Sequence, residues 1–488
     1  MFTSHREFRS LALMAGLVVP ATLTSQAPSE RVARALEAMG GAAAVRGVST
    51  VSADYYAVLY QLGQSETPQS PARASVASGR VASDWRGGRR VRTQETRTAG
   101  GTVQRTRRVT AGGIGLLETD GRLAPDGAPA VAAAERAMRR EPDRLLLAAL
   151  AHPEALSAVG TTRWRGETLD AVRFAFGPDT LALFFDRFTA LLTGVESLSD
   201  HPILGDGRTA TWYTRWQDAG GGVRLPRQAD VTLNGEAQEH WVYSAVAANA
   251  PLDEAPLAIP DSIAARAPRA PASPPRITVT LAELAPGVWR AEGGSHHSLV
   301  VEQERELVLV EAPLSSARVQ AVLDTLRARF PDKPVGTVVN THYHWDHAGG
   351  LRAVIGAGIP IVTHERNAGF IHGIAGARKT VAPDGLSRRG RDALLRQVND
   401  SLVLGAGERR VVLYALPTAH VEGMLAAYVP GGGIFFTSDV LPGNAASVAA
   451  GSREVMAFAR GHRLAIARVA GGHGDVMPWA DVERAAAR

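Results

Sequence analysis

The chain has 488 residues, with 53 Lys and Arg, 48 Asp and Glu, 14 His and no Cys. This length allows two or three domains, and a hydrophobic content of 45% with 21% charged residues is typical of a folded globular protein. Because there is no cysteine, a disulfide scaffold, thiolate metal ligands and a cysteine nucleophile are all excluded.

The net charge of +5 is not concentrated in one part of the chain. Only Lys333 and Lys379 are lysines, and the net charge is +1 over residues 1–27, +1 over 28–270 and +3 over 271–488. The densest group of arginines, between residues 86 and 108, falls in an alternating stretch that predicts antiparallel strands with a solvated face. We therefore expect no nucleic-acid partner.

The first 27 residues have the layout of a secretory signal peptide. Arg6 and Arg9 precede an apolar run from Leu11 to Leu23, and residues 25–27 (Ser-Gln-Ala) supply the small residues of a cleavage site. The run is too short to span a membrane and contains Pro20. We expect export, to the periplasm or outside the cell, with no membrane span in the mature chain. The alternative is an uncleaved membrane anchor.

Residues 28–250 predict a β-rich N-terminal domain of the α+β class. A short helix ending at Gly40-Gly41 comes first, and the alternating stretches 51–60 and 103–110 predict strands. Residues 131–158 read as helical with an interruption at Pro142, and an antiparallel meander follows from 171 to 242. This order weakly resembles the curved half-barrels of periplasmic lipoprotein-carrier proteins. The resemblance implies lipid or amphiphile binding, with an accessory C-terminal domain, as one alternative function.

Residues 251–275 contain seven prolines among alanines and predict a linker between two domains. Beyond it, residues 276–488 alternate apolar strands with helices. The stretches 299–301, 307–310, 335–339 and 359–363 predict strands, while 315–330 and a segment beginning near Gly350 predict helices. This alternation indicates sheets covered by helices.

The strand that ends at Val339 leads directly into an unusual group of polar side chains. His342, His344, Asp346 and His347 lie within six residues. Burying several imidazoles and a carboxylate at the end of a strand is costly unless they pair or bind a cation. In extended backbone His342 and His344 point to the same side, so they can bind one metal together.

This segment resembles the H-x-H-x-D-H signature of the metallo-β-lactamase superfamily of binuclear zinc hydrolases. Three further ligand types follow in the order of the family, each just after a predicted strand: His420, Asp439 and His473. The resemblance implies an αββα sandwich over residues 276–488, with the site at one sheet edge. It also implies two Zn²⁺ ions, with iron or manganese possible instead. The implied ligands are His342, His344 and His420 for the first ion and Asp346, His347 and His473 for the second, with Asp439 bridging the two.

The same resemblance implies a hydrolase in which a metal-bound hydroxide attacks a carbonyl or ester centre of a small-molecule substrate. Asp346 is the implied catalytic residue, orienting that hydroxide as well as binding metal. Asp439 occupies the position at which true β-lactamases of the family have a cysteine or a serine. An aspartate at this position is typical of the thioesterase-, lactonase- and phosphodiesterase-like members. We therefore predict an ester, thioester or lactone as substrate. β-Lactam hydrolysis and a degenerate, structural site are the alternatives.

Residues near the motif complete the expectations. Glu311 ends a predicted strand where the family usually has Asp. His296 and His297 precede another strand, and we expect them in a surface loop, with one of them at the mouth of the pocket as the alternative. An insertion at 366–400, where members of the superfamily build substrate pockets, contains four candidate anion contacts: Arg366, His372, Arg378 and Lys379.

Overall fold

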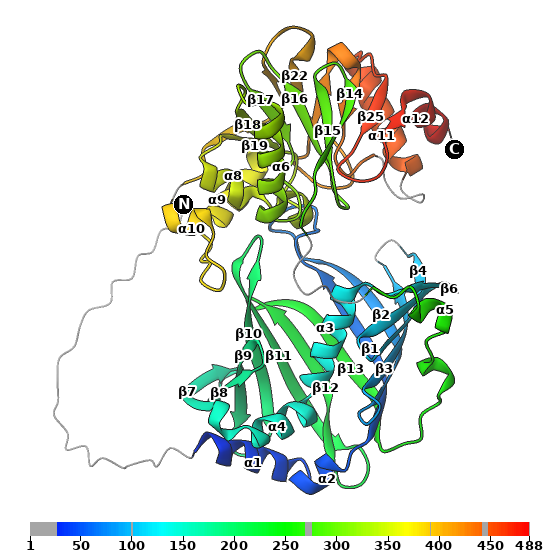
Figure 1. Cartoon of the computed structure of the whole chain (residues 1–488), viewed down its shortest axis with the longest axis vertical. Coiled ribbons are helices and arrows are strands. Elements are labelled where there is room, and N and C mark those ends of the chain that lie inside the picture. Colours follow the sequence, from blue (N-terminus) through cyan, green and yellow to red (C-terminus); the bar gives the residue numbers. More distant parts are fainter. Residues whose placement is uncertain (1–26, 99–100, 269–275, 391, 442–447, 488) are drawn as a thin grey trace, which may run out of the picture.

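The computed structural model describes residues 27–98, 101–268, 276–390, 392–441 and 448–487. It has two parts, an N-terminal domain (blue to green in Figure 1) and a C-terminal domain (green to red). All of the predicted signal segment except Ala27 lies outside the described residues, so cleavage and export stay predictions. Across the described ranges, no helix is long and apolar enough to cross a membrane.

The N-terminal domain is built on one antiparallel sheet of 13 strands, in the order β6-β5-β4-β3-β2-β1-β13-β12-β11-β10-β9-β8-β7. The sheet is continuous because β1 pairs with both β2 and β13. The strands are β1 (Thr50–Gln61), β2 (Arg73–Asp84), β3 (Arg89–Arg97), β4 (Val103–Ala111), β5 (Ile114–Thr119), β6 (Arg122–Pro125), β7 (Leu156–Trp164), β8 (Glu167–Phe176), β9 (Asp179–Asp186), β10 (Leu192–His201), β11 (Gly205–Asp218), β12 (Arg224–Leu233) and β13 (Glu236–Ala248).

The sheet curves around two helices, α3 (Ala128–Arg139) and α4 (Pro142–Ala151), while α1 (Pro28–Ala38) and α2 (Ala42–Arg46) close one end (Figure 1). The helical stretch divides at Pro142 because proline has no N–H to donate within a helix, whereas it fits the first helical position. Leu145 and Leu146 of α4 pack with Leu36 of α1 and with the alternating apolar residues of β8 and β9, forming the main core of this domain. The β-rich α+β architecture is as predicted.

Part of the segment expected as a linker is folded. The short helices η2 (Ala255–Leu257) and α5 (Asp261–Ala264) lie on the N-terminal sheet, and Leu257 and Ile263 are buried with Val91, Val109 and Leu116 of β3, β4 and β5. Residues 269–275 of the expected linker lie outside the described residues.

The C-terminal domain contains two sheets, one of seven strands (β14-β15-β16-β17-β18-β19-β20) and one of six (β21-β22-β23-β24-β25-β26). The first consists of β14 (Thr280–Ala285), β15 (Val288–Glu292), β16 (Ser298–Glu302), β17 (Leu307–Val310), β18 (Val335–Asn340), β19 (Ile361–His364) and β20 (Leu395–Val398). The second consists of β21 (Ser401–Leu404), β22 (Val411–Ala415), β23 (Leu425–Val429), β24 (Ile434–Phe436), β25 (Arg468–Ala470) and β26 (Met477–Pro478).

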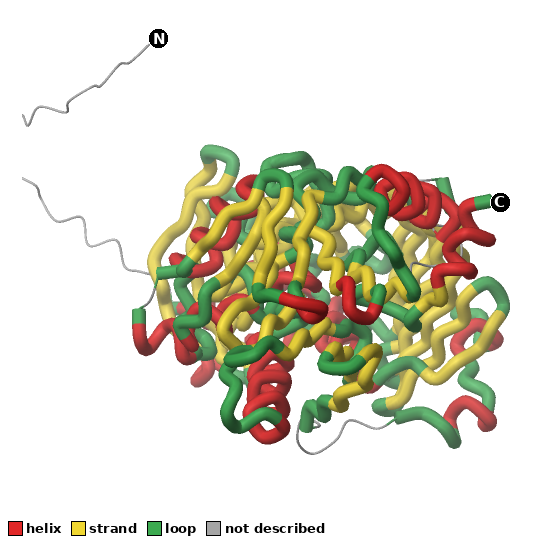
Figure 2. Tube along the Cα trace, turned by 90° about the horizontal axis from the view of Figure 1, so that it is seen from above, coloured by secondary structure: helices red, strands yellow, loops and turns green. Residues whose placement is uncertain are grey.

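The two sheets face each other and carry helices on their outer faces. Val301 and Val339 of the first sheet are buried against Leu413, Leu425 and Phe436 of the second. The other faces are covered by α6 (Ser316–Arg329), α8 (Leu351–Ala357) and α9 (Ala368–Gly376) on one side and by α11 (Val448–Gly461) and α12 (Trp479–Ala486) on the other. Figure 2 shows helices (red) on either side of the strands (yellow). The predicted αββα sandwich is confirmed.

Two segments of the N-terminal domain reach the C-terminal domain. The hairpin between β10 and β11 inserts Ile203 into the core beneath α8 and α9, and Asp206 accepts hydrogen bonds from the backbone N–H groups of Thr380 (2.6 Å) and Val381 (3.0 Å). Asp200 in the same hairpin pairs with Lys379. The second segment, residues 62–72 between β1 and β2, is here named the β1–β2 loop, and it lies directly against the polar cluster described next.

Candidate metal centre

All seven predicted site residues meet at one edge of the sandwich. β18 ends at Asn340, and the following turn carries His342 and His344 into the short helix α7 (Trp345–Ala348), which holds Asp346 and His347. His420, Asp439 and His473 follow β22, β24 and β25 respectively. Because the segments after these strands converge, residues far apart in the chain form two groups that could each hold a metal ion.

The first group consists of His342, His344, His420 and Asp439. Its ring nitrogens converge, with His344 Nδ1 3.1 Å from His420 Nε2. Asp439 Oδ2 lies 3.1 Å from His420 Nε2 and 3.7 Å from His342 Nε2. Two ligands each about 2.05 Å from a tetrahedral zinc lie about 3.3 Å apart, so these separations suit a shared ion.

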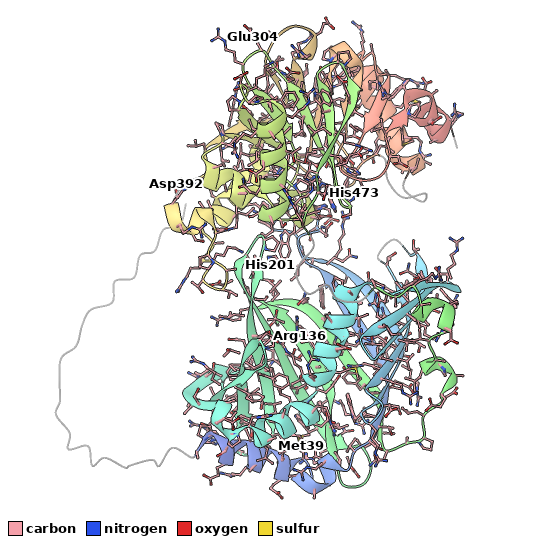
Figure 3. The ribbon with its side chains drawn as sticks, in the orientation of Figure 1. Met39, Arg136, His201, Glu304, Asp392 and His473 are labelled. Carbon is pink, nitrogen blue, oxygen red and sulfur yellow. The ribbon has the colours of Figure 1, made fainter. Side chains whose placement is uncertain are left out.

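The second group consists of Asp346, His347 and His473, together with His296. His347 Nε2 and His473 Nε2 are 3.2 Å apart, and Asp439 Oδ1 lies 2.7 Å from the first and 3.1 Å from the second. Asp439 therefore touches both groups with its two oxygens. Figure 3 labels His473 at the edge of the C-terminal domain that faces the N-terminal domain.

The outward-facing nitrogens of four histidine rings have acceptors of their own. His344 Nε2 lies 2.9 Å from the carbonyl oxygen of Ser65, and His473 Nδ1 lies 3.3 Å from that of Ser295. His347 Nδ1 lies 2.9 Å from Glu311 Oε2, and His342 Nδ1 lies 3.0 Å from Thr341 Oγ1. Since the proton of each neutral ring is drawn to the outer nitrogen, the inner nitrogen presents a lone pair, which is the form that binds a metal.

Two of the inner atoms make no well-formed hydrogen bond. His342 Nε2 and Asp439 Oδ1 are buried and have no hydrogen bond of good geometry among the described residues, although Asp439 Oδ1 lies 2.7 Å from His347 Nε2. Facing lone pairs repel one another, and buried polar atoms without partners are costly, so this arrangement is stable only with a cation or protons between the side chains. The donor set of imidazole and carboxylate, without thiolate, fits zinc and also fits iron or manganese.

The electrostatic environment acts differently on the histidines of the two groups. Burial lowers the pKa of His342 and of His344, so both rings are neutral near pH 7. Burial alone would raise the pKa of Asp439, but His347 and the other surrounding histidines hold that pKa far below the usual range. The nearby Glu311 and Asp439 carboxylates raise the pKa of His347 against the effect of burial, and Asp439 raises that of His473. A metal ion bound at the second group must therefore displace protons from these two rings, whereas His342 and His344 already have the neutral form that metal binding requires.

Glu311 orients the ring of His347, a role that its position in the sequence did not establish. Its side chain is fully buried, it accepts hydrogen bonds from Thr341 Oγ1 (2.8 Å) and Ser438 Oγ, and it orients His347 as described above. Its backbone has a φ of +75°, which is unfavourable for a non-glycine residue. The chain tolerates this backbone strain where a carboxylate holds the ring of a metal-ligand candidate.

The expectation that His296 lies in a surface loop was wrong. Its side chain is buried, its Nε2 lies 3.2 Å from Asp346 Oδ2, and its ring centroid lies 3.9 Å from that of His473. No periodic pattern marks His296, because the turn between β15 and β16 approaches the second group only when the two sheets pack together.

The β1–β2 loop of the N-terminal domain also contacts the site, and no signal in the sequence marks it. Gln64 Nε2 donates to Asp346 Oδ1 (2.8 Å), and Ser65 supplies the carbonyl partner of His344. Arg73, which begins β2, donates to the carbonyl oxygen of His420 (2.9 Å). The loop and the first residue of β2 thus contact three of the seven site residues. At Gly63, with a φ of +72°, a Cβ atom would lie 2.3 Å from the ring of Trp345, so only glycine fits this close approach.

Replacing Gln64 by alanine should weaken metal retention about tenfold, because the orientation of Asp346 loses one of its two hydrogen bonds. Titration of the metal-loaded protein with a chelator, followed by metal analysis, measures this change. Gln61→Ala is the matched control, since Gln61 is exposed at the end of β1, and it should retain metal as the wild type does. Equal metal retention in both variants would contradict a role for the β1–β2 loop.

Two of the candidate anion contacts in the insertion, Arg378 and Lys379, have another environment. Lys379 pairs with Asp200, and the backbone carbonyl of Arg378 accepts a hydrogen bond from the Asp206 N–H (2.7 Å). Both residues therefore belong to the contact between the domains.

An αββα sandwich with five histidines and two carboxylates at one sheet edge is compatible with a metal-dependent hydrolase, the class to which the sequence motif pointed. Residues 291–458 match the family model described as the metallo-beta-lactamase superfamily. This match confirms the predicted family for the C-terminal domain.

Solved structures with similarity to this chain include a metallo-beta-lactamase from Pontibacter korlensis, at 17% identity and a TM-score of 0.33, covering 42% of this chain and 96% of that one. Another is the metallo-beta-lactamase FIM-1 from Pseudomonas aeruginosa in its mono-zinc form, at 19% identity and a TM-score of 0.34, covering 44% of this chain and 96% of that one. A search of curated protein sequences finds no match.

Proposed function

We propose that the protein is a hydrolase that holds two zinc ions, the first on His342, His344 and His420 and the second on Asp346, His347 and His473, with Asp439 between them. The observation that carries this proposal is the hydrogen bonding of the outward ring nitrogens, which leaves the inner nitrogens to face a common centre. When bound, two such ions supply Lewis acidity and a nucleophile derived from water at neutral pH.

Asp346 is the proposed catalytic residue. One oxygen of its carboxylate accepts a hydrogen bond from Gln64, and the other is hydrogen-bonded to the ring of His296. About a third of the side chain is exposed. Although burial favours its neutral form, hydrogen bonds from His296 and Gln64 and the nearby His347 keep its pKa low. Asp346 is therefore an ionised, firmly held acceptor that can orient an attacking water molecule.

An adjacent cavity supports an apolar substrate. A space of about 750 Å³ lies where the two domains meet, beside Tyr343 and Trp345, the residues on either side of His344. The β10–β11 hairpin, with His201 labelled at its tip in Figure 3, borders this space. Its lining includes Ile203, Phe370 and Ile374, and contains one carboxylate, Glu236, but no Lys or Arg. Such a wall suits the hydrocarbon part of a neutral ester, thioester or lactone better than a phosphodiester.

Hydrolysis of a substrate panel by the zinc-loaded protein tests this proposal. We expect turnover of aryl esters, thioesters and lactones, with kcat/KM rising as the acyl chain lengthens from acetyl to octanoyl, and no turnover of a bis-aryl phosphodiester. Asp346→Ala should reduce kcat by about 10²-fold or more.

Two outcomes would count against the proposal. Faster turnover of a chromogenic cephalosporin than of any ester would establish β-lactam hydrolysis instead. Full activity in Asp346→Ala would refute the role of that carboxylate. Asp475→Ala, at an exposed aspartate two residues after His473, is the control that should behave as the wild type.

A further inference from the structure

The N-terminal domain contains a second cavity, separate from the metal centre. It has a volume of about 370 Å³ and lies between α3 and the strands β3 and β4. Figure 1 shows α3 lying on the concave side of the sheet. The cavity is lined by three arginines, one threonine and four alanines: Arg90, Arg92, Arg108, Thr110, Ala130, Ala133, Ala134 and Ala137.

The alanines explain why the space exists. Ala130, Ala133, Ala134 and Ala137 are spaced as i, i+3, i+4 and i+7, so they share the face of α3 that borders the cavity. Larger apolar side chains on that face would fill the gap between helix and sheet, as Val131 and Met138 do on the buried side of the same helix. The face of α3 that borders the cavity therefore carries alanine side chains opposite three arginines.

Two of the three arginines have carboxylate partners. Arg90 donates through Nη2 to Glu141 (2.7 Å), and Arg108 forms an ion pair with Asp126, with its Nε 2.7 Å from Asp126 Oδ2. Even so, Nε of Arg90 is buried without a hydrogen-bond partner among the described residues. The pairing of Arg90 is thus incomplete, and one of its N–H groups is left for a further acceptor.

Arg92 has no such partner. Its guanidinium lies over the ring of Trp241, 5.1 Å from the ring centroid, and no hydrogen bond or ion pair joins it to any residue in the described ranges. Glu239 instead accepts a hydrogen bond from Trp241 Nε1 (2.7 Å). Burial, with the neighbouring charge of Arg90, lowers the pKa of Arg92. The side chain of Arg92 is half-buried, and its five N–H donors and its charge have no direct carboxylate partner among the described residues, so they remain open to an anion that enters the cavity.

A largely apolar surface continues from the same place. A smaller cavity of about 70 Å³ shares Arg90 with the first and is bordered mainly by apolar and aromatic residues, among them Val51, Ala53, Tyr213 and Tyr243, with Glu141, the partner of Arg90, and Asp143 at one side. The arginines therefore stand between a small-residue helix face and an aromatic and aliphatic sheet face. A ligand held there needs both an anionic group and an apolar body.

We propose that this cavity binds a small organic carboxylate, whose charged group pairs with Arg92 and with the free Nε–H of Arg90 while its hydrocarbon part lies against the alanines of α3. Planar guanidinium groups bind carboxylates through paired hydrogen bonds, and these charge-assisted bonds are the strong ones. The cavity is at the small end of the usual range for ligand pockets, which points to a single short chain. The site is independent of the proposed hydrolase activity.

Calorimetric titration of the full-length, zinc-loaded protein with sodium octanoate tests the proposal. We expect saturable binding of octanoate and binding of the neutral octanamide that is at least tenfold weaker. Arg92→Met should reduce octanoate affinity by about 10- to 100-fold, as expected for the loss of a charge-assisted pair. Arg97→Met, at an exposed arginine of the same strand, is the matched control and should bind as the wild type does.

Two further measurements separate a ligand site from a structural arginine. In the absence of ligand, Arg92→Met should raise the Tm by about 2 °C, because a half-buried charge without an ion-pair partner is removed. Ala134→Phe, which fills the cavity and keeps Arg92, should also lose octanoate binding. A carboxylate bound at the metal centre would be unaffected by either substitution. Equal binding in the wild type, Arg92→Met and Ala134→Phe, or no octanoate binding at all, would overturn the proposal.

Discussion

Replacing Asp439 by asparagine should lower hydrolytic activity at least about a thousandfold and leave the chain with no more than one bound metal ion. The carboxylate of Asp439 is the one group that touches both sets of ligands, within 2.7 Å of His347 and 3.1 Å of His420 and His473. An amide keeps the shape of the side chain but loses the negative charge, and its NH₂ group would face imidazole lone pairs or a cation. Both proposed ions therefore lose a ligand at once.

Metal analysis of the purified variant, together with kcat and KM on the best ester of the panel, measures this effect. Asp475→Asn is the matched control, since it removes an exposed carboxylate close to His473 but outside both groups. Two tightly bound ions in Asp439→Asn would refute the bridging position of this residue. A loss of activity with both ions retained would instead assign Asp439 to the chemical step alone.

Replacing Glu311 by alanine should have the largest effect on stability, reducing the free energy of unfolding by about 3–5 kcal/mol. The side chains of Glu311 and His347 are both fully buried, and removal of the carboxylate leaves His347 Nδ1, Thr341 Oγ1 and Ser438 Oγ without their common acceptor. Buried donors that lose their partner carry the full cost of desolvation. The ring of His347 also loses its fixed orientation, so metal affinity should fall 10- to 100-fold.

Urea unfolding of the metal-free protein measures the stability change separately from the effect on metal binding. Glu311→Asp should recover part of both, because it retains a carboxylate at the same backbone position. Glu304→Ala, at an exposed position in the turn before β17, should change the free energy of unfolding by less than about 0.5 kcal/mol. Equal stability of Glu311→Ala and Glu304→Ala would show that the buried network contributes nothing.

The seven candidate ligands could be found from the sequence because the signals that mark them are local. His342, His344, Asp346 and His347 are adjacent in the chain, and His420, Asp439 and His473 each follow an apolar strand whose pattern is readable without a partner. The end of the helix α3 and the start of α4 could be placed for a similar reason, since Pro142 constrains its own backbone.

The surroundings of these ligands could not be found in this way. Gln64 and Asp346 are 282 positions apart, and Ser65 acts through a backbone carbonyl, which any residue would supply. His296 looks like a loop histidine until the sheets pack, and Arg92 looks like a solvated strand residue until α3 covers that face. In each case the deciding neighbour comes from another element, so no periodicity in the sequence records the contact.

The sequence by itself determined the lack of thiol chemistry, the two-part organisation, and the histidines and carboxylates available to bind metal, because composition, strand periodicity and short motifs depend on nearby residues. Only the tertiary structure decided that the β1–β2 loop reaches the ligands of the other domain, that Glu311 orients His347, and that Arg92 is left without a counter-charge. Those features arise from the packing of distant elements, in which a side chain gains or loses a partner only when the sheets, helices and domains come together.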